Sequence, residues 1–311
     1  EEAKGALKNS FDLLYDNQWV GKESFEKAEQ KLQEDAAYLA IKKAGKKPDF
    51  FIAGDLQNQI VASNYTARTL DIPFFGLFAA CATTMEALSL AALMVNSRAA
   101  SRVLVAASSH MNSAEKEFRY PNEYGIQKAP TCQRTVTAAG AAMVGYGGDT
   151  DVFIPSVTIG RVVDMGITDP TDLGSAMAPA VVDTICAHLR ETKSKPEDYD
   201  MIVTGDLGQI GQRIALDMLK EKGNYTIEPS KFMDCGLKIY HADQDAFCGG
   251  SGAGCVASVT FGYIYNNIRS GIWQKVLVAA SGALFSPLTY QQKESIAGIS
   301  HAVCLQKGGN A

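Results

Sequence analysis

The residue in this chain that is best suited to chemistry is Cys81, which lies within the stretch 74–88. A bulky apolar run leads to this cysteine, and small residues, two threonines and an Ala/Leu-rich segment follow it. This order predicts a buried strand that turns directly into a buried helix, with the sulfur near the helix N-terminus. The free N–H groups and the macrodipole at a helix start lower the pKa of a thiol, or hold a bound anion. The alternative is a small apolar cysteine of the core.

Composition narrows the function classes. The 311 residues suggest two domains or two fused half-domains, and the net charge of −5, without any basic run, argues against a nucleic-acid partner. The seven cysteines show neither paired C-x-x-C spacing nor Cys/His metal spacing, so we expect reduced thiols and no metal site. The longest apolar run, 74–95, contains Glu86, so we expect a soluble protein with a buried core segment there and no transmembrane helix.

The elements around Cys81 follow an α/β pattern. A charged amphipathic helix is predicted over 24–44, a buried strand over 49–55, a helix over 58–70 and another buried strand over 102–108. Continuous apolar strands that alternate with helices are typical of a parallel sheet. Residues 1–22 have no such pattern, so no strand is expected before the first helix.

The second half of the chain repeats the first. Gly-Asp-Leu follows a strand at both 54–56 and 205–207, and Val-Leu-Val-Ala-Ala-Ser occurs at both 103–108 and 276–281. The shared segments keep the same order, which indicates an internal duplication. We therefore predict two α/β halves, 1–150 and 151–311, with the first strand of the N-terminal half missing.

The duplication also predicts a second helix start opposite Cys81. The position equivalent to Cys81 is Gly254, within the small-residue segment 248–255. Glycines at this place are best explained by close backbone packing, since they lack the order of a nucleotide-binding loop. Two helix starts in equivalent positions could then face one shared pocket.

Several strings resemble the stage V sporulation protein AD family, within the thiolase-like superfamily. They cover nearly the whole chain and are Ala-Gly-Asp-Leu at 53–56, Ala-Cys-Ala-Thr-Thr-Met-Glu at 80–86, Ser-Ser-His at 108–110, Phe-Arg-Tyr-Pro-Asn-Glu-Tyr-Gly at 118–125, Gly-Arg-Val-Val-Asp-Met-Gly-Ile-Thr-Asp at 160–169, Gly-Ser-Ala-Met-Ala-Pro at 174–179, Asp-Cys-Gly-Leu at 234–237, Gly-Gly-Ser-Gly at 249–252 and Gln-Gln-Lys-Glu-Ser-Ile at 291–296. The resemblance implies a duplicated thiolase-like fold with five layers, α-β-α-β-α.

The resemblance also implies a function. Proteins of this family bind dipicolinic acid (pyridine-2,6-dicarboxylate) and aid its uptake into the developing spore, together with other stage V A sporulation membrane proteins at the forespore or spore inner membrane. We therefore expect a peripheral protein that binds dipicolinate or its calcium chelate, with no cofactor other than an accompanying Ca²⁺. A homodimer is expected by analogy with thiolases.

Thiolase-type catalysis needs a thiolate and two or three His, Asn or Cys partners. The segment 247–252 has neither the His nor the Asn that these enzymes carry there, so we expect no enzyme activity. The alternative is a Cys-dependent acyltransferase or condensing enzyme that uses Cys81 with His110 or His301.

A small planar dianion calls for hydrogen-bond donors, positive potential and an aromatic or apolar wall. The residues that we expect to bind it are Cys81, Thr83, Thr84, His110, Arg119, Gly250, Ser251 and His301. Further candidates are Arg134 and Arg161 for a bidentate carboxylate contact, and Tyr120, Tyr124 and Phe247 for stacking on the ring.

Other polar residues have plainer explanations. Asp55 and Asp206 are expected to form turns after their strands, and His188, in a charged helical segment, to lie on the surface. Glu86 should have a hydrogen-bond partner or face a pocket, because buried carboxylates are seldom unpaired.

Overall fold

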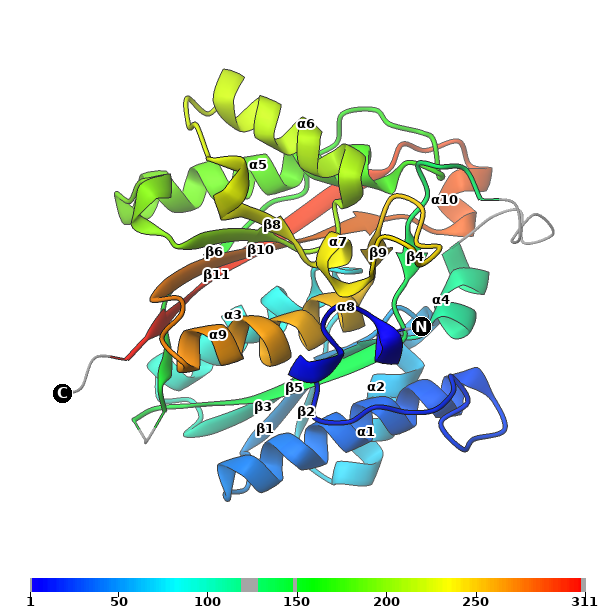
Figure 1. The fold of residues 1–311 in the computed structure, drawn as a ribbon. Coiled ribbons are helices and arrows are strands. Elements are labelled where there is room, and N and C mark those ends of the chain that lie inside the picture. The colour runs from blue at the N-terminus through cyan, green and yellow to red at the C-terminus, as the bar shows by residue number, and fades with distance from the viewer. Residues whose placement is uncertain (1, 119–127, 148–149, 309–311) are drawn as a thin grey trace.

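The computed structural model describes residues 2–118, 128–147 and 150–308, and it has the five layers expected from the sequence (Figure 1). Helices α1 (Phe25–Ala44) and α2 (Val61–Leu70) cover the outer face of one sheet. Helices α5 (Leu173–Thr192) and α6 (Gly208–Glu221) cover the outer face of the other sheet, and α3 (Thr83–Asn96) and α8 (Ala253–Ser258) lie between the sheets.

The first sheet has the strand order β2-β1-β3-β5. Its strands and the remaining elements of this half are β1 (Phe50–Gly54), β2 (Phe74–Gly76), β3 (Arg102–Ser109), α4 (Met111–Phe118), β4 (Arg134–Thr135) and β5 (Ala138–Gly145), with 3-10 helices η1 (Glu2–Lys4), η2 (Lys8–Ser10) and η3 (Asn58–Ile60). β1 is parallel to β2 and β3, and β5 runs antiparallel to β3.

The second sheet has the strand order β6-β11-β10-β7-β8. The further elements of this half are β6 (Val152–Ile159), η5 (Pro196–Asp198), β7 (Met201–Thr204), η6 (Pro229–Lys231), β8 (Phe232–Asp234), α7 (Cys235–Ile239), β9 (Gly250–Ser251), the π-helix η7 (Val259–Ile264), α9 (Tyr265–Arg269), β10 (Lys275–Leu284), α10 (Pro287–Gln291) and β11 (Ala297–Lys307). β9 pairs with β4 of the first half.

The duplication seen in the sequence holds in three dimensions. β2, β1, β3 and β5 of the first sheet correspond in order and direction to β8, β7, β10 and β11 of the second. β6 lies beyond β11, and the described residues of the first half contain no strand at the equivalent place beside β5. The repeated Val-Leu-Val-Ala-Ala-Ser segments are the central strands β3 and β10.

The boundaries of α1 confirm the sequence prediction. The Ser24 side chain accepts the N–H of Lys27, and Gly45 ends the helix in the left-handed conformation.

Within the described residues, no helix is both long enough and apolar enough to cross a membrane.

Two expectations about the segment before Cys81 are wrong in detail. The predicted buried strand is the three-residue strand β2 at the edge of its sheet, and Phe75 and Phe78 are 45% and 53% exposed. The helix predicted from residue 58 becomes α-helical only at Val61, because Gln59 and Ile60 have φ angles of 56° and 48°. These are rare values for residues other than glycine, and for a β-branched residue such as Ile60 they mark local strain.

The two central helices, α3 and α8, begin against each other (Figure 1). The hydroxyl of Thr84 donates to the carbonyl oxygen of Ala253 at 3.1 Å. Gly254 packs so closely on β3 and β5 that a Cβ there would overlap the carbonyl oxygen of Ala138 and lie 2.7 Å from the amide nitrogen of Ser109. Close backbone packing therefore explains this glycine, as predicted.

Gly254→Ala should lower the free energy of unfolding by about 1–3 kcal/mol, because the added methyl group meets backbone atoms that cannot move alone. Urea unfolding followed by circular dichroism measures the change. The control is Gly145→Ala on β5, where the nearest atom to a new Cβ is 3.4 Å away. Equal stability of the two variants would contradict the packing argument.

Candidate functional site

Cys81 lies in the turn between β2 and α3, as the sequence indicated. The residue is half-buried, and the preceding Ala80 has a strained φ of 49°. The Thr83 hydroxyl donates to the carbonyl oxygen of Ala80 at 2.7 Å and accepts the N–H of Ala79 at 3.1 Å. This hydroxyl therefore holds the turn that presents Cys81.

Cys81 has a buried acid, Asp206, as a polar partner. The thiol hydrogen-bonds to the Asp206 carboxyl, which also accepts the N–H of Gly252 at 3.2 Å and the hydroxyl of Ser281 at 3.1 Å. We call Cys81, Asp206, Gly252 and Ser281 the acid–thiol cluster. Cys81 and Gly252 precede α3 and α8, Asp206 follows β7 and Ser281 lies on β10, so both halves build it.

Burial and charge give the acid–thiol cluster unusual proton affinities. Burial, with a smaller contribution from the charge of nearby Asp234, raises the pKa of Asp206 to about 7. Burial and the charge of Asp206 raise the pKa of Cys81 well above its usual value. The sequence predicted a lowered pKa from the helix start alone. That expectation is wrong because the sulfur is desolvated by burial and because a carboxyl, Asp206, lies beside it.

A second buried acid holds the turn that carries Asp206. Asp234, at the end of β8, accepts the N–H groups of Leu207 at 2.9 Å and Leu237 at 3.2 Å and the hydroxyl of Thr204 at 2.6 Å. These bonds fix the Gly-Asp-Leu turn of the second half. The repeated motif was a visible signal for Asp206, but the sequence does not reveal that this side chain turns toward Cys81.

The other small residues of the predicted site are used within the protein. The Thr84 hydroxyl joins the two helix starts. Gly250 and Ser251 form β9 and pair with Arg134 and Thr135 of β4. The structure thus brings Cys81, Thr83, Thr84, Gly250 and Ser251 into one region, mainly as the framework of the turns.

The two candidate histidines differ in their surroundings. His110 is fully buried, and its ring nitrogens bond to the Gln18 carbonyl oxygen at 2.8 Å and to the Asn112 N–H at 3.2 Å. His301, on β11, accepts the N–H of Gly160 at 3.2 Å through Nδ1. Burial lowers the pKa of both rings. The partners of His110 belong to the N-terminal segment and to its own turn, not to the acid–thiol cluster.

The structure describes only some of the predicted basic and aromatic residues, and those have partners within the protein. Arg119, Tyr120 and Tyr124 lie outside the described residues. The exposed Arg161 pairs with Asp183 at 2.7 Å, which is the surface ion pair that was the alternative explanation. One Arg134 nitrogen donates to the Asp245 carbonyl oxygen at 3.2 Å.

Lys128 was missed by sequence reasoning and lies close to the site. It pairs with Glu115 at 2.8 Å, both side chains being nearly buried, and its ammonium group is 5.7 Å from the centre of the Phe247 ring. Cys248, the residue after Phe247, accepts the N–H of Gln209 through its carbonyl oxygen. This bond places the loop that carries Phe247 beside the Asp206 turn. Nothing in the sequence around Lys128 marks it as different from a surface lysine.

Three other polar residues that the sequence singled out differ in how far the expectation holds. His188 was expected on the surface, but it is fully buried, because its ring bonds to Thr158 at 2.8 Å and to Tyr199 at 3.0 Å. Asp55 forms its turn as predicted, accepting the N–H of Gln57 at 2.9 Å. Glu86 is half-buried and burial raises its pKa, but its Oε2 atom is buried without a hydrogen-bond partner among the described residues, so the expected partner is not found at that atom.

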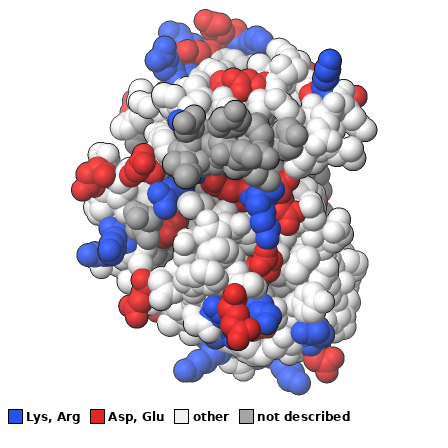
Figure 2. All heavy atoms as spheres, turned by 90° about the vertical axis from the view of Figure 1, so that its right-hand side faces the viewer, with Lys and Arg blue, Asp and Glu red and all other residues white. Residues whose placement is uncertain are grey.

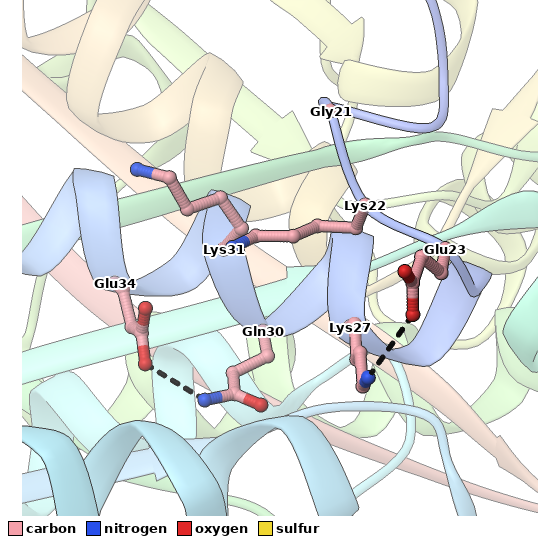
Figure 3. Close-up of a pocket in the computed structure, with 7 residues that line it drawn as sticks. All are labelled: Gly21, Lys22, Glu23, Lys27, Gln30, Lys31 and Glu34. Carbon is pink, nitrogen blue, oxygen red and sulfur yellow. Dashed lines mark hydrogen bonds and ion pairs between the residues drawn. The ribbon is translucent and has the colours of Figure 1, made fainter.

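Two hollows lie outside the acid–thiol cluster. A depression of about 440 Å³ beside α1 is lined by Gly21, Lys22, Glu23, Lys27, Gln30, Lys31 and Glu34 (Figure 3). Of its charged side chains, Lys27 pairs with Glu23 at 3.8 Å, and Glu34 accepts a hydrogen bond from Gln30 at 2.8 Å. A groove of about 260 Å³ runs between the strained turn at 57–60 and residues 76–78. On the face shown in Figure 2, acidic and basic side chains are interspersed.

Comparison with known proteins identifies relatives along the whole chain. Residues 1–306 match the family model described as Stage V sporulation protein AD. A protein of that name from Bacillus subtilis (strain 168) is 46% identical over 314 residues, which cover 100% of this chain and 92% of the relative.

Solved structures with a similar fold are condensing enzymes and thiolases. The 3-oxoacyl-[acyl-carrier-protein] synthase III from Aquifex aeolicus VF5 is 16% identical, with a TM-score of 0.56 over 89% of this chain and 84% of that one. The Acat5 thiolase from Ascaris suum, solved with coenzyme A, is 10% identical, with a TM-score of 0.61 over 92% and 96%. At these identities the likeness shows the thiolase-like fold alone.

Asp206→Asn should speed alkylation of Cys81 by iodoacetamide near neutral pH by about tenfold or more, since each unit of thiol pKa changes the thiolate fraction about tenfold. The amide removes the negative charge that opposes the thiolate. Mass spectrometry of the Cys81 peptide separates this thiol from the other six. Asp217→Asn, at an exposed position on α6, is the control. An unchanged rate would mean that Asp206 does not govern the thiol.

Proposed function

Because the chain belongs to the Stage V sporulation protein AD family, we propose that it binds dipicolinic acid and aids its uptake into the developing spore without catalysing a reaction. Membership over the whole chain supports the sporulation role. Binding of dipicolinate and its uptake are what the resemblance to this family implies.

One observation favours binding over catalysis: the Cys81 thiol donates a hydrogen bond to the carboxyl of a buried acid, Asp206, and so keeps its proton. A condensing enzyme needs a thiolate together with groups that move protons and hold an oxyanion. Here the thiol is kept protonated, His110 is engaged by the N-terminal segment, and the segment before α8 supplies no His or Asn.

The surroundings of Cys81 offer features that suit a planar dicarboxylate. The partly exposed Phe247 ring can form an aromatic wall beside the loop that contacts the Asp206 turn, and Lys128, which is ion-paired with Glu115 at 2.8 Å, lies 5.7 Å from the centre of that ring. In this proposal Cys81 lies at the floor of the pocket, and Thr83, Thr84, Gly250 and Ser251 shape it. His301, and Arg119 outside the described residues, remain candidate contacts, and Ca²⁺ can enter as the dipicolinate chelate.

Calorimetric titration with pyridine-2,6-dicarboxylate, with and without Ca²⁺, should show saturable binding that Cys81→Trp abolishes, because the indole fills the pocket. Ser97→Trp, at the exposed opposite end of α3, should bind as the unmodified protein does. No heat of binding at millimolar ligand would refute the proposal. A Cys81-linked acyl group in the intact mass after incubation with acyl-CoA would instead support the alternative, a Cys-dependent acyltransferase or condensing enzyme that uses Cys81 with His110 or His301.

We also propose that the protein works at the forespore or spore inner membrane through protein partners, the other stage V A sporulation membrane proteins, and as a homodimer. The edge strand β2 and the exposed Phe75 and Phe78 offer a surface for a second copy. Sedimentation velocity should give a dimer for the protein and a monomer for Phe78→Ser. A monomeric unmodified protein at micromolar concentration would contradict the homodimer.

A further inference from the structure

Asp206 is a buried carboxyl whose described neighbours carry no positive charge. It accepts three donors: the Cys81 thiol, the Gly252 N–H and the Ser281 hydroxyl. None of these is a cation, and the residue has no exposed surface. An ionised carboxylate held in this way lacks the partner that buried charges normally require.

The other titratable groups around Asp206 do not supply the missing positive charge, and some of them add negative charge. Asp234 at the end of β8 is a second, fully buried carboxyl whose charge acts on Asp206. The thiols of Cys235 on α7 and Cys255 on α8 also lie within its electrostatic reach, as does Cys81 before α3. Each of these groups is either neutral or negative, so none compensates a charge on Asp206.

A bound dicarboxylate would bring further negative charge to the same place. Near Cys81, an ionised Asp206 and a ligand carboxylate would repel each other in a region of low dielectric constant. A protonated Asp206 would be neutral, which removes this repulsion even though the side chain itself is fully buried. The site can therefore accept the anion more easily when it also accepts a proton.

We propose that Asp206 takes up one proton from solvent when the site binds dicarboxylate, so that the pocket loads at lower pH and releases its ligand as the pH rises. This inference depends on the proposed function and adds to it a mode of regulation. The ligand remains a dianion throughout, and the proton resides on the Asp206 carboxyl. The pKa of Asp206, raised by burial to about 7, makes this exchange accessible near neutral pH.

The test is calorimetric titration with pyridine-2,6-dicarboxylate from about pH 6 to about pH 8.5, in pairs of buffers with different ionisation enthalpies. The ligand carboxyls stay ionised over this range. The dissociation constant should rise about tenfold for each pH unit above about 7, with uptake of nearly one proton at the alkaline end. Binding whose heat and affinity are independent of buffer and pH would overturn this inference and leave the proposed function standing. Absence of binding at every pH would overturn both.

Variants assign the proton to its residue. Asp206→Asn should bind without proton uptake and with an affinity that does not change with pH. Glu86→Gln and Glu29→Gln should keep the uptake, although burial shifts the pKa of each of these groups. Loss of uptake in either of these two variants, with uptake kept in Asp206→Asn, would refute the assignment. If Asp206→Asn does not fold, the proton count of the unmodified protein still decides whether binding and protonation are coupled.

Discussion

The structure depends on the close approach of two buried helix starts. α3 and α8 meet between the sheets, where the Thr84 hydroxyl bonds to the Ala253 carbonyl and Gly254 packs against the backbone of β3 and β5. A larger residue at 254 would push α8 away from the first sheet. Because this contact fixes both helices, it also fixes the turn that carries Cys81 and the N–H of Gly252 that reaches Asp206.

The duplicated Gly-Asp-Leu turns have diverged in what their acids contact. In the first half, the Asp55 carboxyl accepts the N–H and hydroxyl of Ser63 at 2.8 and 2.7 Å, next to the buried Glu29. In the second half, Asp206 accepts a thiol from the other half. The equivalent turns therefore have different uses: in the first half Asp55 caps the local helix start, and in the second half Asp206 forms part of a site that both halves share. Such a difference between equivalent positions is where function is expected to lie.

The acid–thiol cluster also explains how a fold shared with condensing enzymes can be used differently. A helix start stabilises a thiolate only when no nearby negative charge opposes it. Here burial and Asp206 together outweigh the helix, and the pKa of Cys81 rises. The group of this cluster that gains or loses a proton near neutral pH is therefore the Asp206 carboxyl, whose pKa is about 7, and not the Cys81 sulfur.

Sequence alone determined the elements and their order. Apolar periodicity, the Ser24 cap and the repeated strand segments predicted α1, β1, β3, β7 and β10, and the duplication predicted the paired helix starts. The motif resemblance predicted the family and the layered fold. These features are local or repeated, so neighbouring residues specify them.

Tertiary structure decided which side chains meet. The Phe74–Gly76 strand became an exposed edge because no strand pairs on its outer side among the described residues, and His188 was buried by partners from β6 and from the end of η5. The contact between Cys81 and Asp206 joins residues 125 positions apart in the sequence. Its effect on both pKa values comes from burial and charge in three dimensions, which no local pattern encodes.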